Sequence, residues 1–186
     1  MSSASRYLLR KRKQIYDRMI RVDHAGEFGA DRIYAGQMAA LRRASPEKAK
    51  VVQELWDQEK AHLREFEYLL LKHRGRKSFL TPIWSAAGFA LGYGSALIGH
   101  EAAMACTVAI EKVIADHYNA QIRELAADDL HAHKPLISVF SNFRDDEQHH
   151  HDTGLAHEAE KAPLYPTMSF VVENISKLAI KIAEKV

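Results

Sequence analysis

The chain has 186 residues, 47% hydrophobic and 27% charged, which is the composition of one globular domain rather than of a disordered or collagen-like protein. Its single cysteine excludes a disulfide framework and a multi-cysteine zinc site, and its formal net charge of +2 argues against nucleic-acid binding. Only five prolines and nine glycines occur, and apolar residues recur with a helical period, so we predict an all-α fold with one domain over residues 1–186.

The beginning of the chain is basic: residues 2–21 contain seven Lys or Arg and one Asp. Residues 1–13 lack the apolar run of a secretory signal. We expect them to form a loosely ordered basic arm that favours an anionic surface, although a transit-peptide remnant has a similar composition. The first helix is expected to begin at Tyr7 or Gln14 and to end near Arg43.

The second helix has a clear start. In Ser45-Pro46-Glu47, serine is a favourable N-cap, proline suits the first helical position and glutamate suits the first turn. The following residues place an apolar stripe on one face as far as His73, and the basic segment 72–77 then interrupts the pattern. We therefore predict a helix over residues 46–73.

Residues 78–99 differ from the rest because they contain no acidic residue, Lys, Arg or His. A helix of this length would extend about 33 Å, enough to cross a bilayer core. Three interpretations stay open: a buried bundle helix, a transmembrane span, or a helix lying in the membrane interface. The basic residues just before it favour a membrane-associating helix over residues 78–100. Gly88 and Gly92 lie four residues apart, which predicts a close contact with another helix.

Three further helices are expected, over residues 101–127, 135–161 and 167–185. Residues 128–135 are predicted to form a loop in which His131 and His133 are solvated, with Pro135 starting the next helix. The last helix has an apolar face and a lysine-rich face, a pattern that suits a core helix or a membrane-facing helix equally.

Two Glu-x-x-His pairs, Glu59 with His62 and Glu147 with His150, are candidate metal ligands. Residues three apart share one face of a helix, so both side chains of a pair can reach one metal ion. The pairs alone are weak evidence in a chain with eleven histidines. We choose His150 over its neighbour His151 because only His150 follows a glutamate by three residues.

Each pair is preceded along the chain by a predicted helix in which a glutamate lies among small, mostly apolar residues. These glutamates are Glu27 and Glu111. Glu111 follows nine uncharged residues, and a buried carboxylate must be paired, protonated or bound to metal. The order Glu, Glu-x-x-His, Glu, Glu-x-x-His is that of the di-iron or di-manganese sites of ferritin-like bundles. We therefore predict a ferritin-like four-helix bundle with a di-metal carboxylate site, plus the two extra helices at 78–100 and 167–185.

Other residues near these positions are less informative. Asp23 and Asp31 lie one turn from Glu27 and could orient ligand imidazoles, while a solvated or ion-paired role is an equal alternative. Tyr34 and Tyr118 lie seven residues after a glutamate ligand, face inward and are expected mainly to pack the core. Cys106 is expected to be a small core residue.

Several segments resemble the demethoxyubiquinone hydroxylase family of ubiquinone biosynthesis over residues 18–186. They are Asp23-His24-Ala25-Gly26-Glu27, Ile33-Tyr34-Ala35-Gly36-Gln37, Trp56-Asp57-Gln58-Glu59-Lys60-Ala61-His62, Gly88-Phe89-Ala90-Leu91-Gly92, residues 103–109, His117-Tyr118-Asn119 and Phe143-Arg144-Asp145-Asp146-Glu147. The acid before Glu147 is Asp146, a mild departure from the family pattern that we expect to leave ligation unchanged.

The resemblance implies a di-iron centre whose ligands are Glu27, Glu59, His62, Glu111, Glu147 and His150. It implies hydroxylation of the quinone ring of a polyprenylated demethoxyubiquinone intermediate, with O₂ as co-substrate and NADH as the ultimate reductant. It also implies peripheral attachment to a membrane, the matrix side of the mitochondrial inner membrane in a eukaryote or the cytoplasmic membrane in a bacterium. Eukaryotic members of the family work with a lipid-binding partner protein.

Two other functions stay open at this stage. A ferritin-like metal-storage or peroxidase protein would explain the ligands but not the apolar segment. A non-catalytic quinone-binding subunit would bind lipid without stoichiometric metal. The residues do not distinguish iron from manganese, and a homo-oligomer stays possible.

Overall fold

A computed structural model describes residues 3–186, so the first two residues of the expected basic arm lie outside the described part. The described residues are helical and contain no strand, which confirms the all-α prediction. The elements are α1 (Ser3–Ala44), α2 (Pro46–His73), α3 (Thr81–Ile98), α4 (His100–Ala156), the short 3-10 helix η1 (Ala159–Lys161) and α5 (Tyr165–Ala183).

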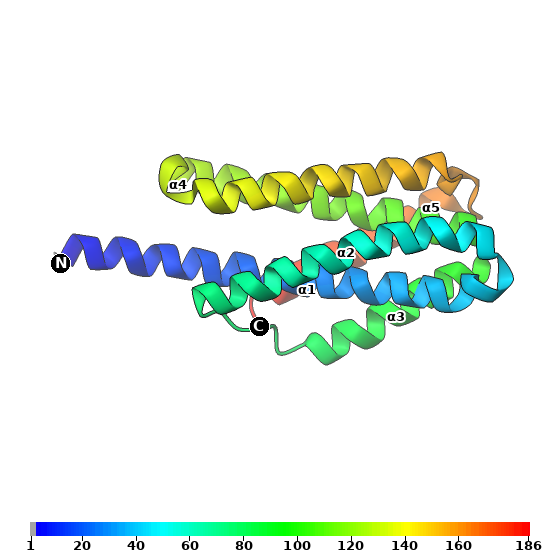
Figure 1. Ribbon diagram of the computed structural model, residues 1–186, viewed down its shortest axis with the longest axis horizontal. Helices are drawn as coiled ribbons and strands as arrows, with labels where there is room; N and C mark the ends of the chain where they lie inside the picture. Colours follow the sequence, from blue (N-terminus) through cyan, green and yellow to red (C-terminus); the bar gives the residue numbers. More distant parts are fainter. Residues whose placement is uncertain (1–2) are drawn as a thin grey trace.

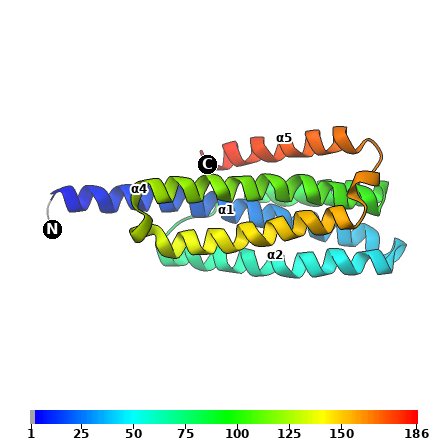
Figure 2. The same ribbon diagram turned by 90° about the horizontal axis from the view of Figure 1, so that it is seen from above.

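Helix α4 is two helices joined at a sharp bend. Asp129 has non-helical angles (φ −162°, ψ 93°) and divides α4 into a first arm, residues 100–128, and a second arm, residues 130–156. Figures 1 and 2 show α1, α2 and the two arms side by side along the molecule. The expected loop over 128–135 is therefore wrong. The turn is short because Asp129 Oδ1 accepts a hydrogen bond from the Ala132 amide at 2.9 Å and caps the second arm.

The expectation of a loosely ordered arm is also wrong for residues 3–13, which form the first turns of α1. This end of α1 runs past the bend of α4 (Figures 1 and 2). Its cations meet the acids at the bend: Lys11 pairs with Asp128, and Arg12 lies 3.7 Å from Asp129. The helix thus starts earlier than the predicted Tyr7 or Gln14, supported by charge partners distant in sequence.

The remaining boundaries differ by a few residues. Helix α2 ends at His73 as predicted, and α3 lies within the predicted 78–99. The second arm ends at Ala156 instead of residue 161, because Glu158 adopts a left-handed conformation (φ 69°) that a helix does not continue through. Helix α5 covers residues 165–183 instead of 167–185.

Helix α3 packs against α1 through its glycines, as the spacing of Gly88 and Gly92 predicted. A Cβ atom on Gly88 would lie 2.8 Å from the Gly29 carbonyl oxygen, so only glycine permits this approach. The opposite face is open, with Leu97 and Ile98 more than 60% exposed. The buried-helix interpretation is therefore wrong for α3. No helix within residues 3–186 has both the length and the apolar character needed to cross a membrane.

Candidate metal centre

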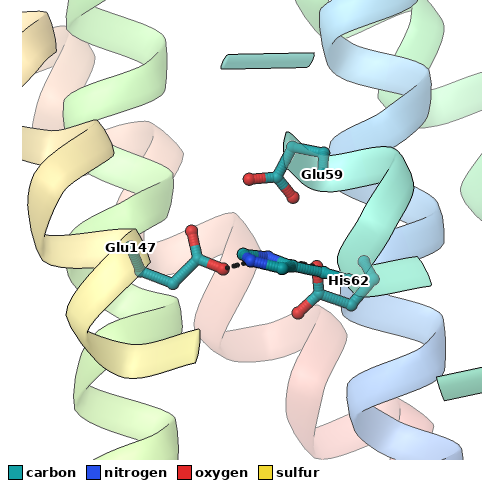
Figure 3. A group of neighbouring side chains, drawn as sticks. Glu59, His62 and Glu147 are labelled. Atoms are coloured by element: carbon teal, nitrogen blue, oxygen red, sulfur yellow. Dashed lines mark ion pairs between the residues drawn. The ribbon is translucent and has the colours of Figure 1, made fainter. Parts of the chain in front are cut away.

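The six predicted ligands meet at the centre of the bundle. Glu27 comes from α1, Glu59 and His62 from α2, Glu111 from the first arm of α4, and Glu147 and His150 from the second arm. All six side chains belong to residues no more than 3% exposed. Figure 3 shows Glu59 and His62 on α2 facing Glu147 on the opposite helix. The two Glu-x-x-His pairs thus act as the spacing predicted, each presenting both side chains to one interior point.

The ligand atoms form two overlapping groups. Glu27, Glu59, His62 and Glu147 each offer an atom within 4.8 Å of the others, and so do Glu59, Glu111, Glu147 and His150. Each group contains three carboxylates and one imidazole. Glu59 and Glu147 belong to both groups, whereas Glu27 and Glu111 each belong to one.

The donor set fits cations because several of its buried atoms make no hydrogen bond. Both oxygens of Glu59, one oxygen each of Glu27, Glu111 and Glu147, and Nδ1 of His62 make no hydrogen bond within the described chain. Buried polar atoms are rarely left in this state, and an absent ion is one explanation for such a group. Carboxylate and imidazole ligands suit iron and manganese.

The electrostatics of the cluster point the same way. Burial raises the pKa of Glu27 to about 8, against the lowering effect of His62, and burial together with Glu147 raises the pKa of Glu111 well above its usual value. Burial also acts to raise the pKa of Glu147, but His150 and His62 outweigh it and lower that pKa to about 2. The cluster therefore needs positive charge.

The negative charge of the cluster favours the protonated, cationic form of both imidazoles. Burial acts to lower the pKa of each, yet the Glu147 and Glu27 carboxylates raise that of His62 to about 12, and Glu147 and Glu59 raise that of His150 to about 11. The protonated imidazoles thus supply positive charge to the carboxylates, which is what a bound metal ion would also do.

Each imidazole points one nitrogen inward and the other at an outer partner. His62 Nδ1 lies 3.2 Å from Glu147 Oε1, while its Nε2 lies 3.1 Å from Asp146 Oδ2. His150 Nδ1 lies 2.8 Å from Glu59 Oε1, while its Nε2 lies 3.1 Å from Gln58 Oε1. An Nε2–H donated outward leaves Nδ1 as the metal-binding lone pair and fixes the ring.

Asp146 and Gln58 were not predicted in this role. Each directly precedes a glutamate ligand in the chain, but the imidazole it contacts belongs to the opposite helix. Sequence spacing gives no signal for such a contact. The sequence indicates only a mild departure from the family pattern at Asp146, whereas the structure places its carboxylate 3.1 Å from His62 Nε2.

His150 and His151 differ in burial. His150 is fully buried within the cluster, whereas His151 is partly exposed and contacts Asp152 on its own helix at 2.9 Å. His150 is therefore the imidazole available to a metal ion.

Tyr34 and Tyr118 do more than pack the core. Tyr34 donates a 2.7 Å hydrogen bond to Glu111 Oε1, and Tyr118 donates a hydrogen bond to Glu27 Oε1. Both hydroxyls thus hold the two glutamates that belong to only one ligand group each.

Among the described residues, Asp23 and Asp31 make no hydrogen bond or ion pair with the ligand imidazoles. The equal alternative, an ion-paired role, is the one the structure favours, since Asp31 pairs with Arg32 at 2.5 Å. Asp31 accepts a 2.7 Å hydrogen bond from the Trp56 indole. Asp23 is buried with two partners that were not predicted: Gln121 donates to it at 2.8 Å, and His117 Nε2 lies 3.2 Å away. It anchors α1 to the first arm of α4 instead.

Two other side-chain predictions have opposite outcomes. His133, expected to be solvated, is fully buried, 2.9 Å from both the Tyr16 hydroxyl and an Asp128 oxygen. His133 lies in the second arm instead of a loop and faces Tyr16 of α1, which explains the error. His131 is exposed and Cys106 is buried, as predicted.

An apolar cavity of about 340 Å³ reaches the metal centre from one side. It lies among α1, α3, the first arm of α4 and α5, with Leu91, Ile110 and Ile180 among its walls. Glu27 and Tyr118 stand at its inner end, and Asp23 and His117 add polar groups to the wall. The cavity can hold an apolar molecule beside Glu27 while keeping bulk water away.

Comparisons with known proteins identify the family. A family model described as "Ubiquinone biosynthesis protein COQ7" matches residues 14–183. The chain belongs to the COQ7 family. It is 49% identical over 175 residues to the Caenorhabditis elegans protein named NADPH-dependent 3-demethoxyubiquinone 3-hydroxylase, mitochondrial, covering 94% of this chain and 92% of that protein.

Other COQ7-family relatives have corresponding names. A Mus musculus protein of the same name is 53% identical over 169 residues, covering 91% of this chain and 77% of that protein. The Rhodospirillum rubrum 3-demethoxyubiquinol 3-hydroxylase is 45% identical over 172 residues, covering 92% and 79%. The animal names specify NADPH, where the resemblance implied NADH.

Proposed function

We propose that this chain is an O₂-dependent di-iron hydroxylase of the benzoquinone ring of a polyprenylated demethoxyubiquinone or demethoxyubiquinol in ubiquinone biosynthesis. The observation that supports it most is the pair of overlapping ligand groups at the inner end of an apolar cavity. The names of the COQ7-family relatives favour the same substrate. On this proposal the helices form a ferritin-like four-helix bundle with α3 and α5 added outside.

When bound, two iron ions would supply the electrons and the binding positions that activate O₂. Glu59 and Glu147 would bridge the ions, Glu27 and His62 would complete one position, and Glu111 and His150 the other. Tyr118 and Tyr34 hold Glu27 and Glu111 by hydrogen bonds and thereby fix the outer carboxylates. The cavity walls exclude water from the reacting centre, which protects an oxidising site from side reactions.

The cavity fits the quinone substrate by its chemistry. Its walls are apolar, while Asp23 and His117 offer polar atoms close to Glu27, where the ring oxygens would lie. The wall helices α3 and α5 also present apolar side chains to the outside, including Ile83, Phe170 and Leu178, each more than half exposed. We infer that this outer surface rests on a membrane, so that a polyprenyl tail enters from the lipid.

The cellular setting follows from the same proposal. The protein would be peripheral to the mitochondrial inner membrane in a eukaryote, or to the cytoplasmic membrane in a bacterium, with NADH or NADPH as the ultimate reductant. A lipid-binding partner protein and self-association are compatible with the exposed apolar helices.

The test combines metal binding with turnover. Purified protein should bind two Fe²⁺ per chain under anaerobic titration and consume O₂ when a short-tailed demethoxyquinol is added. Glu59→Ala and His62→Ala should abolish both, whereas His151→Ala, outside the cluster, should preserve both. Hydroxylation retained by His62→Ala would refute the assignment. Peroxidase activity without quinone turnover would indicate a ferritin-like storage protein, and quinone binding without metal would indicate a non-catalytic subunit.

A further inference from the structure

A second hollow reaches the metal centre from the side away from α5. This groove has a volume of about 400 Å³ and lies between α2 and the second arm of α4, with Ala61 and Glu65 on one side and Asn142 and Asp146 on the other. His62, itself a metal ligand in our proposal, forms part of its floor. Figure 2 shows α2 and the second arm on one side of the molecule and α5 on the other.

The groove and the apolar cavity differ in charge. The groove is lined by the carboxylates of Glu65 and Asp146 and by no Lys or Arg, so it attracts cations. The cavity on the other side is walled mostly by aliphatic side chains. A divalent cation gives up its water only to donor atoms such as oxygen or nitrogen. Besides the groups around Glu27, the ionisable side chains of the cavity wall are Asp23 and His117, which already contact each other.

A continuous series of metal-binding groups leads from the groove to the centre. The Asp146 side chain is 49% exposed, and its Oδ2 lies 3.1 Å from Nε2 of His62. On the other edge of the same ring, Nδ1 lies 3.2 Å from Oε1 of Glu147, a residue that belongs to both ligand groups. Only the His62 ring, stacked on Phe143 with centroids 4.1 Å apart, thus separates an exposed carboxylate from a buried one.

We propose that this groove is the port through which a divalent metal ion enters the centre. Glu65 and Asp146 draw the ion into the groove, and rotation of the His62 ring passes it from Asp146 to Glu147. Metal and quinone would then approach the same centre from opposite sides. The proposal rests on the metal site of the proposed function, but it concerns rates of metal entry and not the reaction.

Two substitutions that fill a hollow with a bulky side chain, one in the groove and one in the apolar cavity, test the port. The probe is Co²⁺ alone, added to metal-free full-length protein. Ala61 lies in the groove and Ala87 in the apolar cavity, and both are exposed. Uptake is followed by the Co²⁺ absorption spectrum in stopped flow, and release by transfer to a chelator. Ala61→Phe should slow uptake and release by equal factors and leave the dissociation constant unchanged, whereas Ala87→Phe should change neither rate.

Slower uptake in Ala87→Phe, or unchanged rates in Ala61→Phe, would overturn the port. Asn142→Phe, on the other wall of the groove, blocks it in the same way if Ala61→Phe fails to fold. Glu65→Gln should lower the association rate of Co²⁺ about tenfold at low ionic strength. Negative charges that line a cleft raise the association rate of a cation by roughly that factor or more. Wild-type protein that binds no Co²⁺ would overturn the metal site itself, a result distinguishable from normal binding with unaltered rates.

Discussion

Gly92 of α3 lies against the backbone of Ile33 in α1 so closely that a Cβ atom added to Gly92 would stand 1.9 Å from the Ile33 carbonyl oxygen. This contact holds α3 against α1 at the wall of the apolar cavity. We therefore expect Gly92→Ala to push the helices apart and to lower the free energy of unfolding by about 1–3 kcal/mol, as overpacking usually does. Urea unfolding measures this loss.

Gly94, two residues further along α3, is the matched control. An added Cβ there meets nothing within 4 Å. Gly94→Ala should therefore be neutral or raise the free energy of unfolding by about 0.5–1 kcal/mol, the usual gain for alanine over glycine within a helix. Equal effects of the two substitutions would show that the close approach of α3 to α1 contributes little.

The exposed apolar face of α5 should govern membrane binding. Leu178 is 58% exposed on α5, and Leu130, at the bend of α4 and not on α3 or α5, is 54% exposed. A charge at the membrane-facing position costs binding energy because it must leave water. Leu178→Glu should thus lower recovery with floated liposomes, while Leu130→Glu should not. Unchanged flotation of Leu178→Glu would contradict membrane contact through this face.

The sequence was sufficient to predict the long helices and the six acidic and histidine side chains that meet at the centre, because both depend on local spacing. An apolar period of 3.6 residues specifies a helix, and a Glu-x-x-His pair specifies one face of it. Glu111 was recognisable because its uncharged neighbours required a buried partner. These signals do not depend on which helices meet in the fold.

The features that were missed depend on contacts between distant segments. Asp146 lies 84 residues from the His62 it contacts, and Gln58 lies 92 residues from His150. Asp129 was read as part of a loop because its capping of the second arm depends on the chain reversing at one residue. His133 was read as solvated for the same reason, since its burial depends on Tyr16 in α1.

The Tyr118 hydroxyl should tune metal binding through Glu27. The Tyr118 hydroxyl donates a hydrogen bond to Glu27 Oε1, while Glu27 Oε2 has no hydrogen-bond partner in the described chain and lies 3.6 Å from His62 Nδ1. Tyr118→Phe should weaken Fe²⁺ or Co²⁺ binding by about 10–100-fold, the usual effect of removing a partner of a metal ligand. Tyr16→Phe, which removes a hydroxyl bound to His133 far from the centre, is the control and should bind normally. Equal affinities for both variants in a metal titration would limit Tyr118 to core packing.

A buried histidine in α1 should make the metal-free protein sensitive to acid. His24 is fully buried, neither ring nitrogen has a hydrogen-bond partner in the described chain, and burial, reinforced by Lys77, lowers its pKa to about 4. Between the unfolded pKa of about 6.5 and pH 4 the unfolded chain binds a proton that the folded chain does not, so stability present above pH 6.5 is lost as the pH falls. The loss of unfolding free energy due to this residue is at most about 3 kcal/mol.

Urea unfolding at pH 7 and pH 5 should show a smaller decrease in the free energy of unfolding for His24→Leu than for wild type. The control His131→Leu, at an exposed position, should follow wild type. An equal decrease in all three proteins would mean that His24 is protonated in the folded chain or reaches water.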